Sequence, residues 1–294
     1  MTKAPLSSPG KRLKNAMIKE NPLAVVGAIN AYCALLAQKA GFNAIYLSGA
    51  GVANASFGMP DLGITTLENV IEDVFRITSI TDLPLVVDAD TGFDDPCRTA
   101  RALIDAGAAA IQIEDQVDSK RCGHRPGKVL VSSDEMQERI KSAVKSKTDP
   151  DFMIIARTDA HAVEGLDGVI ERANQYIEAG ADIIFAEALT RIEEFEKVCH
   201  TVAVPVLANI TEFGKTPLYT MDELGGAGVR LVLYPLTAFR AMNAAALKVY
   251  QTLRVDRTQA TLLDSLQTRE ELYDILNYHE YEKALDEKLS TDKD

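Results

Sequence analysis

Eight short apolar runs, separated by segments with the periodicity of amphipathic helices, constrain the fold more than any other feature of this sequence. The runs are rich in Val, Ile and Leu and do not alternate strictly with polar residues, which is typical of strands covered on both faces of a parallel sheet. Glycines at the ends of helical segments, such as Gly107 and Gly180, predict helix termination just before the next strand. The runs lie at residues 24–30, 44–48, 84–90, 109–115, 152–159, 182–188, 205–211 and 229–235.

Eight strands that alternate with helices predict a (β/α)8 barrel of the TIM type. We expect a single domain over residues 1–294, with a helix before the first strand and a C-terminal helical extension at about 258–290. A doubly wound sheet is the alternative, but no glycine-rich dinucleotide-binding motif follows any of the runs.

The charge balance excludes some classes of partner. Lys and Arg total 31 against 43 Asp and Glu, a net charge of −12, so there is no basic excess to bind nucleic acid or an anionic membrane. The sequence has neither a long apolar segment nor a signal peptide, and we expect a soluble, cytoplasmic protein. The four cysteines form no C-x-x-C pair, so a zinc knuckle or a disulfide framework is not expected.

Polar side chains stand at the ends of six of the runs. In a parallel barrel such residues share the rim where catalytic groups lie, so this pattern predicts an enzyme. These residues are Tyr46, Ser48 and Gly49; Asp88 and Asp90; Glu114 and Asp115; Arg157 and Asp159; Glu187; and Asn209 and Thr211.

Three of these acids suggest a metal site. Asp88 and Asp90 are two residues apart, so their side chains leave a strand on the same face, and Glu114 follows the next strand. Such a set of oxygen ligands suits Mg²⁺, or Mn²⁺, better than zinc, and some of the acids could lie behind the direct ligands. The alternative is that the acids cap the following helices or pair with Arg157.

The segment SKRCGHRPGK, residues 119–128, surrounds Cys122 with basic residues that favour its thiolate. Gly123 and Gly127 allow mobility, and we expect a lid loop at about 116–131. The thiol could act as a nucleophile or as a general acid–base, and the alternative is an incidental cysteine in a surface loop. Arg240 and Arg269, in helical context, read on their own as surface arginines.

The sequence resembles the isocitrate lyase/phosphoenolpyruvate mutase superfamily and, within it, the 2-methylisocitrate lyase family. The resemblance spans residues 9 to 285 and rests on the motifs YLSG, PDLGITTL, VDAD, IEDQ, KRCGHRPGK, ARTDA, NITEFG, LYPLTAFRAMN and QTREELY. It implies a barrel whose last helix is exchanged between subunits, commonly in a homotetramer. The implied reaction is the Mg²⁺-dependent retro-Claisen cleavage of (2S,3R)-2-methylisocitrate to pyruvate and succinate, in the methylcitrate cycle of propionate breakdown.

The resemblance also implies roles for individual residues. Asp88 and Asp90 would bind the metal. Asp61 and Glu114 would lie near the metal without binding it directly. From the chemistry of this reaction we expect Cys122, brought in by closure of the lid, to protonate the succinate carbanion, and a base near Tyr46 and the metal to remove the hydroxyl proton. One departure is Ala50, where relatives often carry Gly. The implied substrate contacts are Ser48, Gly49, Ala50, Gly123, His124, Arg157, Glu187, Asn209, Ile210, Thr211, Arg240 and Arg269.

Alternatives remain at this point. Isocitrate lyase is the nearest, although its chains are longer and tend to carry KKCGH where this chain has KRCGH. Another lyase of 2-hydroxy or 2-oxo dicarboxylates is a second alternative. A non-catalytic relative that binds a dicarboxylate belongs to a different class, and retention of Asp88, Asp90 and Cys122 counts against it.

Overall fold

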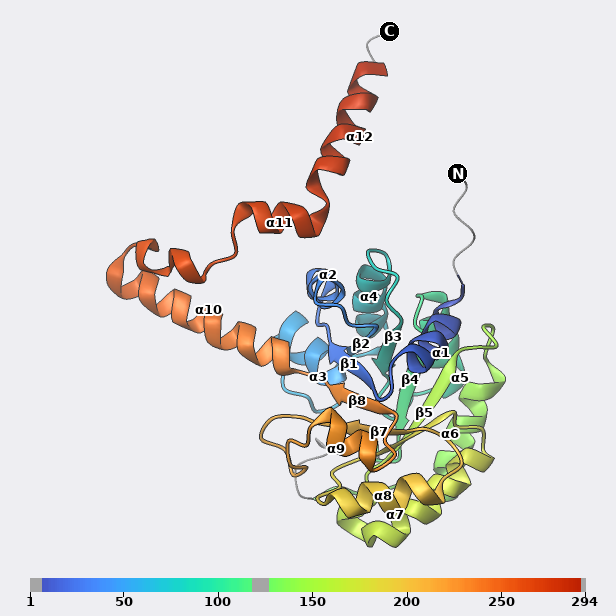
Figure 1. The fold of residues 1–294 in the computed structure, drawn as a ribbon. Helices are drawn as coiled ribbons and strands as arrows, with labels where there is room; N and C mark the ends of the chain where they lie inside the picture. Colours follow the sequence, from blue (N-terminus) through green and yellow to red (C-terminus); the bar gives the residue numbers. More distant parts are fainter. Residues whose placement is uncertain (1–6, 118–126, 292–294) are drawn as a thin grey trace. The chain divides into compact units, whose positions relative to one another are not determined.

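The computed structural model describes residues 7–117 and 127–291. Eight parallel strands pair in chain order, and β8 pairs with β1, so the sheet closes into a barrel without edges (Figure 1). Each predicted apolar run overlaps one strand, so the predicted (β/α)8 fold is confirmed. The strands are β1 Leu23–Gly27, β2 Ala44–Leu47, β3 Leu85–Asp88, β4 Ala110–Glu114, β5 Met153–Thr158, β6 Ile183–Ala186, β7 Val206–Asn209 and β8 Leu231–Tyr234.

In the first unit of the chain, residues 1–239, helices connect the successive strands and lie around the barrel (Figure 1). The predicted helix-ending glycines adopt the left-handed conformation, with φ of 94° at Gly107 and 108° at Gly180. In the first part of the chain the helices are α1 Pro9–Lys19, α2 Ala31–Lys39, α3 Gly49–Gly51, the π-helical turn η1 Val52–Ser56, α4 Leu67–Thr78, α5 Pro96–Asp105, α6 Ser133–Lys145, α7 His161–Glu178, α8 Ile192–Thr201 and α9 Met221–Gly226. The later helices are α10 Thr237–Asp256, η2 Ala260–Ser265, α11 Arg269–Leu276 and α12 Tyr278–Thr291.

Helix α1 covers the end of the barrel at which the strands begin. Leu13 and Met17 pack against side chains inside the barrel, including Met153 at the start of β5. Lys14 Nζ forms an ion pair of 2.8 Å with Asp151, just before the same strand. Apolar side chains therefore fill this end of the barrel, and the polar groups of a site are expected at the opposite rim, where the strands end.

Successive side chains of a strand separate into two cores. On β4, Ile111 and Ile113 pack outward against the helices, whereas Ala110 belongs to the core inside the barrel. Gln112 and Glu114 share the alternation of Ala110 and therefore point inward. This strand thus brings polar groups into the barrel, close to the rim.

The chain divides into two compact units, residues 1–239 and 240–294. The first unit contains the barrel. In the second, Tyr273 and Tyr278 stack with their ring centroids 4.2 Å apart, and Thr268 caps α11 through the backbone N–H of Glu271. The prediction of one domain with a helical extension stays a prediction. Within residues 7–117 and 127–291, no helix is both long and apolar enough to cross a membrane.

Candidate active site

Two buried carboxylates converge at the end of β3. Asp88 closes the strand and Asp90 follows in the left-handed region with φ of 50°, a conformation that Asp tolerates better than most residues. The N–H of Gly49 donates to Asp88 Oδ2 at 3.0 Å. A Cβ added at Gly49 would lie 3.0 Å from Asp90 Oδ1 and 3.3 Å from Asp88 Oδ2, so both carboxylates lie against the same glycine.

This arrangement fits a hard divalent cation. Asp88 and Asp90 are 8% and 7% exposed, and buried carboxylates are costly unless a cation or donors compensate their charge. Among the described residues, no group of three or more acidic, histidine or cysteine side chains is arranged to hold a metal ion. Two carboxylates nevertheless suffice for Mg²⁺, which keeps several water ligands.

The two acids expected behind the metal ligands lie in different environments. Glu114, at the end of β4, is 2% exposed and lies next to Arg157 of β5 in the strand register. Asp61 lies half-buried in the loop between η1 and α4. A pocket of about 300 Å³ adjoins this rim and is lined by Asp90 and by the loops that precede α4 and α5.

Arg157 lies among three carboxylates. Its Nε is 2.9 Å from Asp159 Oδ2 and 3.4 Å from Glu114 Oε2, and its Nη2 is 3.7 Å from Glu187 Oε1. Burial alone would lower the pKa of Arg157, but the three negative charges outweigh it and raise this pKa well above its ordinary value. Arg157 is therefore a permanent cation in a site that is otherwise rich in acids.

Asp159 also accepts from Lys128, near the start of the described range 127–291. Lys128 Nζ lies 2.6 Å from Asp159 Oδ1, and both side chains are buried. Asp159 thus joins Lys128 to Arg157, whose Nε donates to Asp159 Oδ2 and whose Nη2 donates to Asp159 Oδ1. Sequence reasoning missed Lys128, because a lysine in a polar loop gives no sign that it is buried.

Inside the barrel, a chain of hydrogen bonds joins side chains of three neighbouring strands, β2, β4 and β3. The Tyr46 hydroxyl donates to Gln112 Oε1 at 2.7 Å, and Gln112 Nε2 donates to Asp88 Oδ1 at 3.2 Å. Burial, and then the negative charge of Asp88, raise the pKa of Tyr46 well above its ordinary value. The phenol is therefore neutral, and its proton is directed to Gln112. Gln112 was also missed, because one amide in an apolar run gives a weak signal.

Asn209, at the end of β7, carries an acceptor without a partner. Its Nδ2 lies 3.3 and 3.5 Å from the two carboxylate oxygens of Glu187, whereas its Oδ1 is buried and accepts from none of the described residues. Such a buried acceptor is expected to receive a donor from a ligand or water. Ile210 and Thr211 follow Asn209 on the same rim, 4% and 8% exposed.

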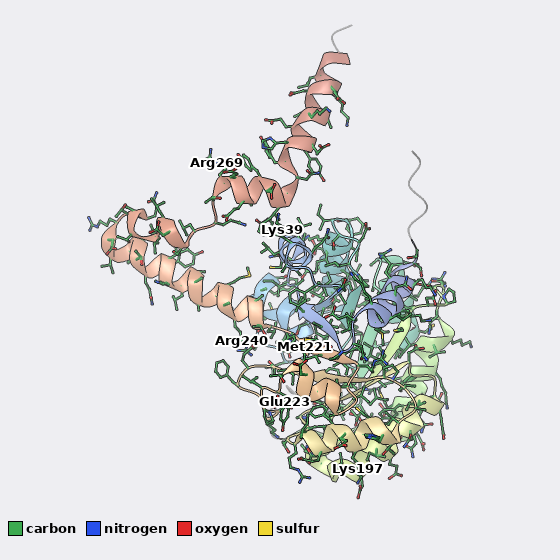
Figure 2. All side chains as sticks on the ribbon, in the orientation of Figure 1. Lys39, Lys197, Met221, Glu223, Arg240 and Arg269 are labelled. Carbon is green, nitrogen blue, oxygen red and sulfur yellow. The ribbon has the colours of Figure 1, made fainter. Side chains whose placement is uncertain are left out.

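The remaining predicted residues fall into three groups. Ser48 is buried and Ala50 half-buried, on either side of Gly49 at the start of α3. Arg240 on α10 and Arg269 at the start of α11 belong to the second unit, where both are exposed (Figure 2). Cys122, Gly123 and His124 lie outside the described residues, as does most of the expected lid loop.

Known proteins resemble this chain over nearly its whole length. The family model described as phosphoenolpyruvate phosphomutase matches residues 13–254. A protein of Escherichia coli (strain K12) named 2-methylisocitrate lyase is 58% identical over 285 residues, which cover 96% of each chain.

Solved structures share the fold. A crystal structure of 2,3-dimethylmalate lyase, described as a PEP mutase/isocitrate lyase superfamily member, has a TM-score of 0.88 and 33% identity and covers 95% of each chain. A structure of phosphonopyruvate hydrolase in complex with oxalate and Mg²⁺ has a TM-score of 0.83 and 28% identity, covering 95% of this chain and 98% of that one. The chain therefore belongs to the phosphoenolpyruvate phosphomutase family, and is highly similar to members of it that are named 2-methylisocitrate lyase.

Proposed function

We propose that this protein is a carbon–carbon lyase that cleaves (2S,3R)-2-methylisocitrate to pyruvate and succinate. The observation that carries the proposal is the convergence of Asp88 and Asp90 on Gly49 at the barrel rim, in a chain that is 58% identical to a 2-methylisocitrate lyase. A metal-binding rim beside a permanent cation, Arg157, suits the cleavage of a polycarboxylate. The pathway would be the methylcitrate cycle of propionate catabolism.

We further propose Mg²⁺ as the metal, with Mn²⁺ able to replace it. Asp88 and Asp90 would hold it, and Glu114 and Asp61 would lie behind them. When bound, Mg²⁺ would polarise the hydroxyl and carboxylate oxygens of the pyruvate-forming half and stabilise their negative charge. The related phosphonopyruvate hydrolase structure with oxalate and Mg²⁺ supports this choice of metal.

The side chains of the rim would orient the substrate. Its three carboxylates need cations, and Arg157 is a permanent cation at this rim, 3.4 Å from Glu114 Oε2. The unpartnered Oδ1 of Asn209 would accept from a protonated group of the substrate or from a bound water. The remaining proposed substrate contacts are Ser48, Gly49, Ala50, Gly123, His124, Glu187, Ile210, Thr211, Arg240 and Arg269, of which Arg240 and Arg269 rest on the resemblance of their motifs.

The cleavage needs one proton removed and one delivered. A base beside Tyr46 takes the proton of the C2 hydroxyl, the C2–O bond becomes the carbonyl of pyruvate, and the C2–C3 bond breaks. Its electron pair moves into the adjacent carboxylate of the succinate half. The Cys122 thiol then gives its proton to C3, which leaves succinate and a cysteine thiolate. Because the Tyr46 phenol is neutral and donates to Gln112, its oxygen would accept from the substrate hydroxyl rather than ionise.

The longest helix among the described residues, α10, supports the proposal of a homotetramer. Helix α10 runs for 20 residues without one buried residue, and apolar side chains such as Leu247 and Tyr250 are exposed. A second copy of the chain would cover them.

We infer a cytoplasmic protein with a small-molecule substrate and without nucleic-acid or membrane partners, in keeping with the net charge of −12.

An assay of two products tests the proposed function. Pyruvate release from 2-methylisocitrate is compared with glyoxylate release from isocitrate during a Mg²⁺ titration. We expect Mg²⁺-dependent release of pyruvate and slow release of glyoxylate. Preferred release of glyoxylate would make the protein an isocitrate lyase, and no turnover of either acid would favour a binding protein.

Cys122→Ser should lower turnover by orders of magnitude while substrate binding is kept.

A further inference from the structure

Gln112 is the central member of the hydrogen-bond chain that joins Tyr46 to Asp88 inside the barrel. Its side chain is fully buried on β4, inside a barrel whose other inward-facing side chains at this depth are mostly apolar. A buried amide is costly unless its oxygen and nitrogen both find partners. Here both do, since the oxygen faces Tyr46 and the nitrogen faces Asp88.

The direction of each hydrogen bond follows from the chemistry of the partners. An ionised carboxylate can only accept, so the group of Gln112 that faces Asp88 must be the NH2 group. The amide oxygen then faces Tyr46, whose single hydroxyl hydrogen has to point at it. The orientation of the Gln112 amide, the rotation of the Tyr46 hydroxyl and one oxygen of Asp88 are therefore set together.

The backbone of Gln112 supports the same segment. Gln112 lies opposite Asp88 in the strand register, and its carbonyl accepts from the N–H of Ala89 at 2.9 Å. Asp88 Oδ1 accepts from Gln112 Nε2 and from the N–H of Asp90, both at 3.2 Å, while Oδ2 accepts from the N–H of Gly49. Backbone donors thus meet Asp88 from two sides, and a side chain from the neighbouring strand meets it from a third.

We propose that Gln112 is a positioning residue of the metal site, one that fixes the carboxylate of Asp88 and turns the Tyr46 hydroxyl so that its oxygen lone pairs face the reactants. The inference rests on the proposed metal role of Asp88 but not on the identity of the substrate. Residues that orient metal ligands from behind typically change metal affinity by about 10- to 100-fold when they are removed.

Binding of Mn²⁺ alone tests this role without any turnover. The free Mn²⁺ in a titration of the whole, unliganded protein is measured by electron paramagnetic resonance. Asp88→Asn should abolish tight binding and so identify the site. Gln112→Met keeps the length of the side chain but has neither amide group, and we expect its Mn²⁺ dissociation constant to rise at least about tenfold. An unchanged constant in Gln112→Met would overturn the proposal.

Two further variants separate positioning from mere folding. Gln112→Asn keeps an amide but is one methylene shorter, so it cannot reach Tyr46 and Asp88 at the same time. We expect it to weaken Mn²⁺ binding as well. It replaces Gln112→Met as the test if the methionine variant does not fold. Gln112→His can accept from Tyr46 and donate to Asp88 through its two ring nitrogens, and we expect it to recover most of the affinity. Equal Mn²⁺ binding in the asparagine variant and the wild type would contradict the proposal.

A matched control addresses general destabilisation. Gln175 on α7 is half-buried and accepts from Ser133, away from the barrel interior. Gln175→Met should lower thermal stability without changing the Mn²⁺ dissociation constant. This test does not depend on the proposed function. If the wild-type protein binds Mn²⁺ but does not cleave 2-methylisocitrate, the Mn²⁺ dissociation constants of the variants still show whether Gln112 positions the metal ligand.

Discussion

Lys128 Nζ lies 2.6 Å from Asp159 Oδ1, and both side chains are almost completely removed from solvent. The same Asp159 carboxylate accepts from Arg157, which also faces Glu114 and Glu187. Lys128 therefore shares the negative charge of Asp159 with Arg157. Without Lys128, Asp159 would interact more strongly with the Arg157 guanidinium. Arg157 would then interact less strongly with a substrate carboxylate.

Lys128→Met should lower both stability and substrate affinity. Removing one partner of a buried ion pair leaves an uncompensated charge, which typically costs about 3–5 kcal/mol. We expect a loss of this size in denaturant unfolding, together with a KM about tenfold higher and a smaller change in kcat, while Lys128→Arg recovers part of each. Lys147→Met is the control, since Lys147 pairs with Asp182 at the opposite end of the barrel at 3.2 Å. A Lys128→Met protein with unchanged KM would show that the pair is purely structural.

Gly49→Ala should impair metal activation while the fold is kept. The new Cβ would lie 3.0 Å from Asp90 Oδ1 and 3.3 Å from Asp88 Oδ2, so at least one carboxylate has to shift. We expect the Mg²⁺ concentration for half-maximal activity to rise at least about tenfold. Gly226→Ala is a suitable control, because a Cβ at Gly226 would meet nothing within 4 Å. Equal Mg²⁺ dependence of Gly49→Ala and wild type would contradict the assigned metal position.

The barrel could be predicted from sequence because burial on both faces leaves a direct pattern. A strand between the barrel interior and a helix layer needs apolar residues at nearly every position, and the eight runs show this. The rim residues followed from topology, since the carboxyl ends of parallel strands meet at one edge. The pairing of Asp88 with Gly49, however, depends on the backbone between β2 and α3, which no residue pattern describes.

Gln112 and Lys128 show where sequence reasoning fails. Gln112 stands in the run AIQIE, where an amide reads as a tolerated exception, and its role depends on the register that places it opposite Asp88. Lys128 follows a glycine in a polar segment that is typical of exposed loops. In both cases the partner is distant in sequence, 24 residues for Gln112 and Asp88 and 31 for Lys128 and Asp159.

The exposed face of α10 should control assembly. Leu247 and Tyr250 are 57% and 69% exposed in the isolated chain, so Leu247→Glu should cost a monomer little but should oppose burial against a second copy. We expect light scattering to give a mass near 32.0 kDa for Leu247→Glu and about four times this mass for the wild type. Lys248→Glu, an exposed position on a neighbouring face, is the control. A wild-type monomer would refute the proposed tetramer.

The stability conferred by Glu164 should depend on pH. Both of its carboxylate oxygens accept from Arg172 at 2.7 Å, and these hydrogen bonds lower the pKa of Glu164 below the unfolded value of 4.5. A carboxyl whose pKa is lower in the folded state stabilises the protein above the unfolded pKa, and this stability is lost as pH falls through the folded pKa. Glu164→Gln should therefore lower Tm at pH 7 but have little effect at the acidic end of the unfolding range.

The size of that effect follows from exposure. Glu164 keeps 36% of its side-chain area accessible, so solvent screening limits the pair to about 1 kcal/mol. For a barrel of this length, this corresponds to a Tm difference of about 2 °C. Glu171→Gln, an exposed position on the same helix, controls for the loss of one negative charge. A difference between Glu164→Gln and wild type that does not shrink on acidification would contradict the assignment.

Asn209→Ala should separate substrate binding from stability. Oδ1 of Asn209 is buried without a donor among the described residues, and Nδ2 makes only long contacts of 3.3 and 3.5 Å to Glu187. Removing the amide therefore costs the free protein little, whereas a substrate that donates to Oδ1 loses a buried hydrogen bond. Such a loss amounts to about 1–3 kcal/mol, so kcat/KM should fall by about 5- to 150-fold. Asn174→Ala on α7, where Nδ2 donates to the Ile170 carbonyl at 3.0 Å, should leave kcat/KM unchanged. If Asn209→Ala instead lowers Tm strongly and keeps kcat/KM, then Asn209 serves the fold and not the substrate.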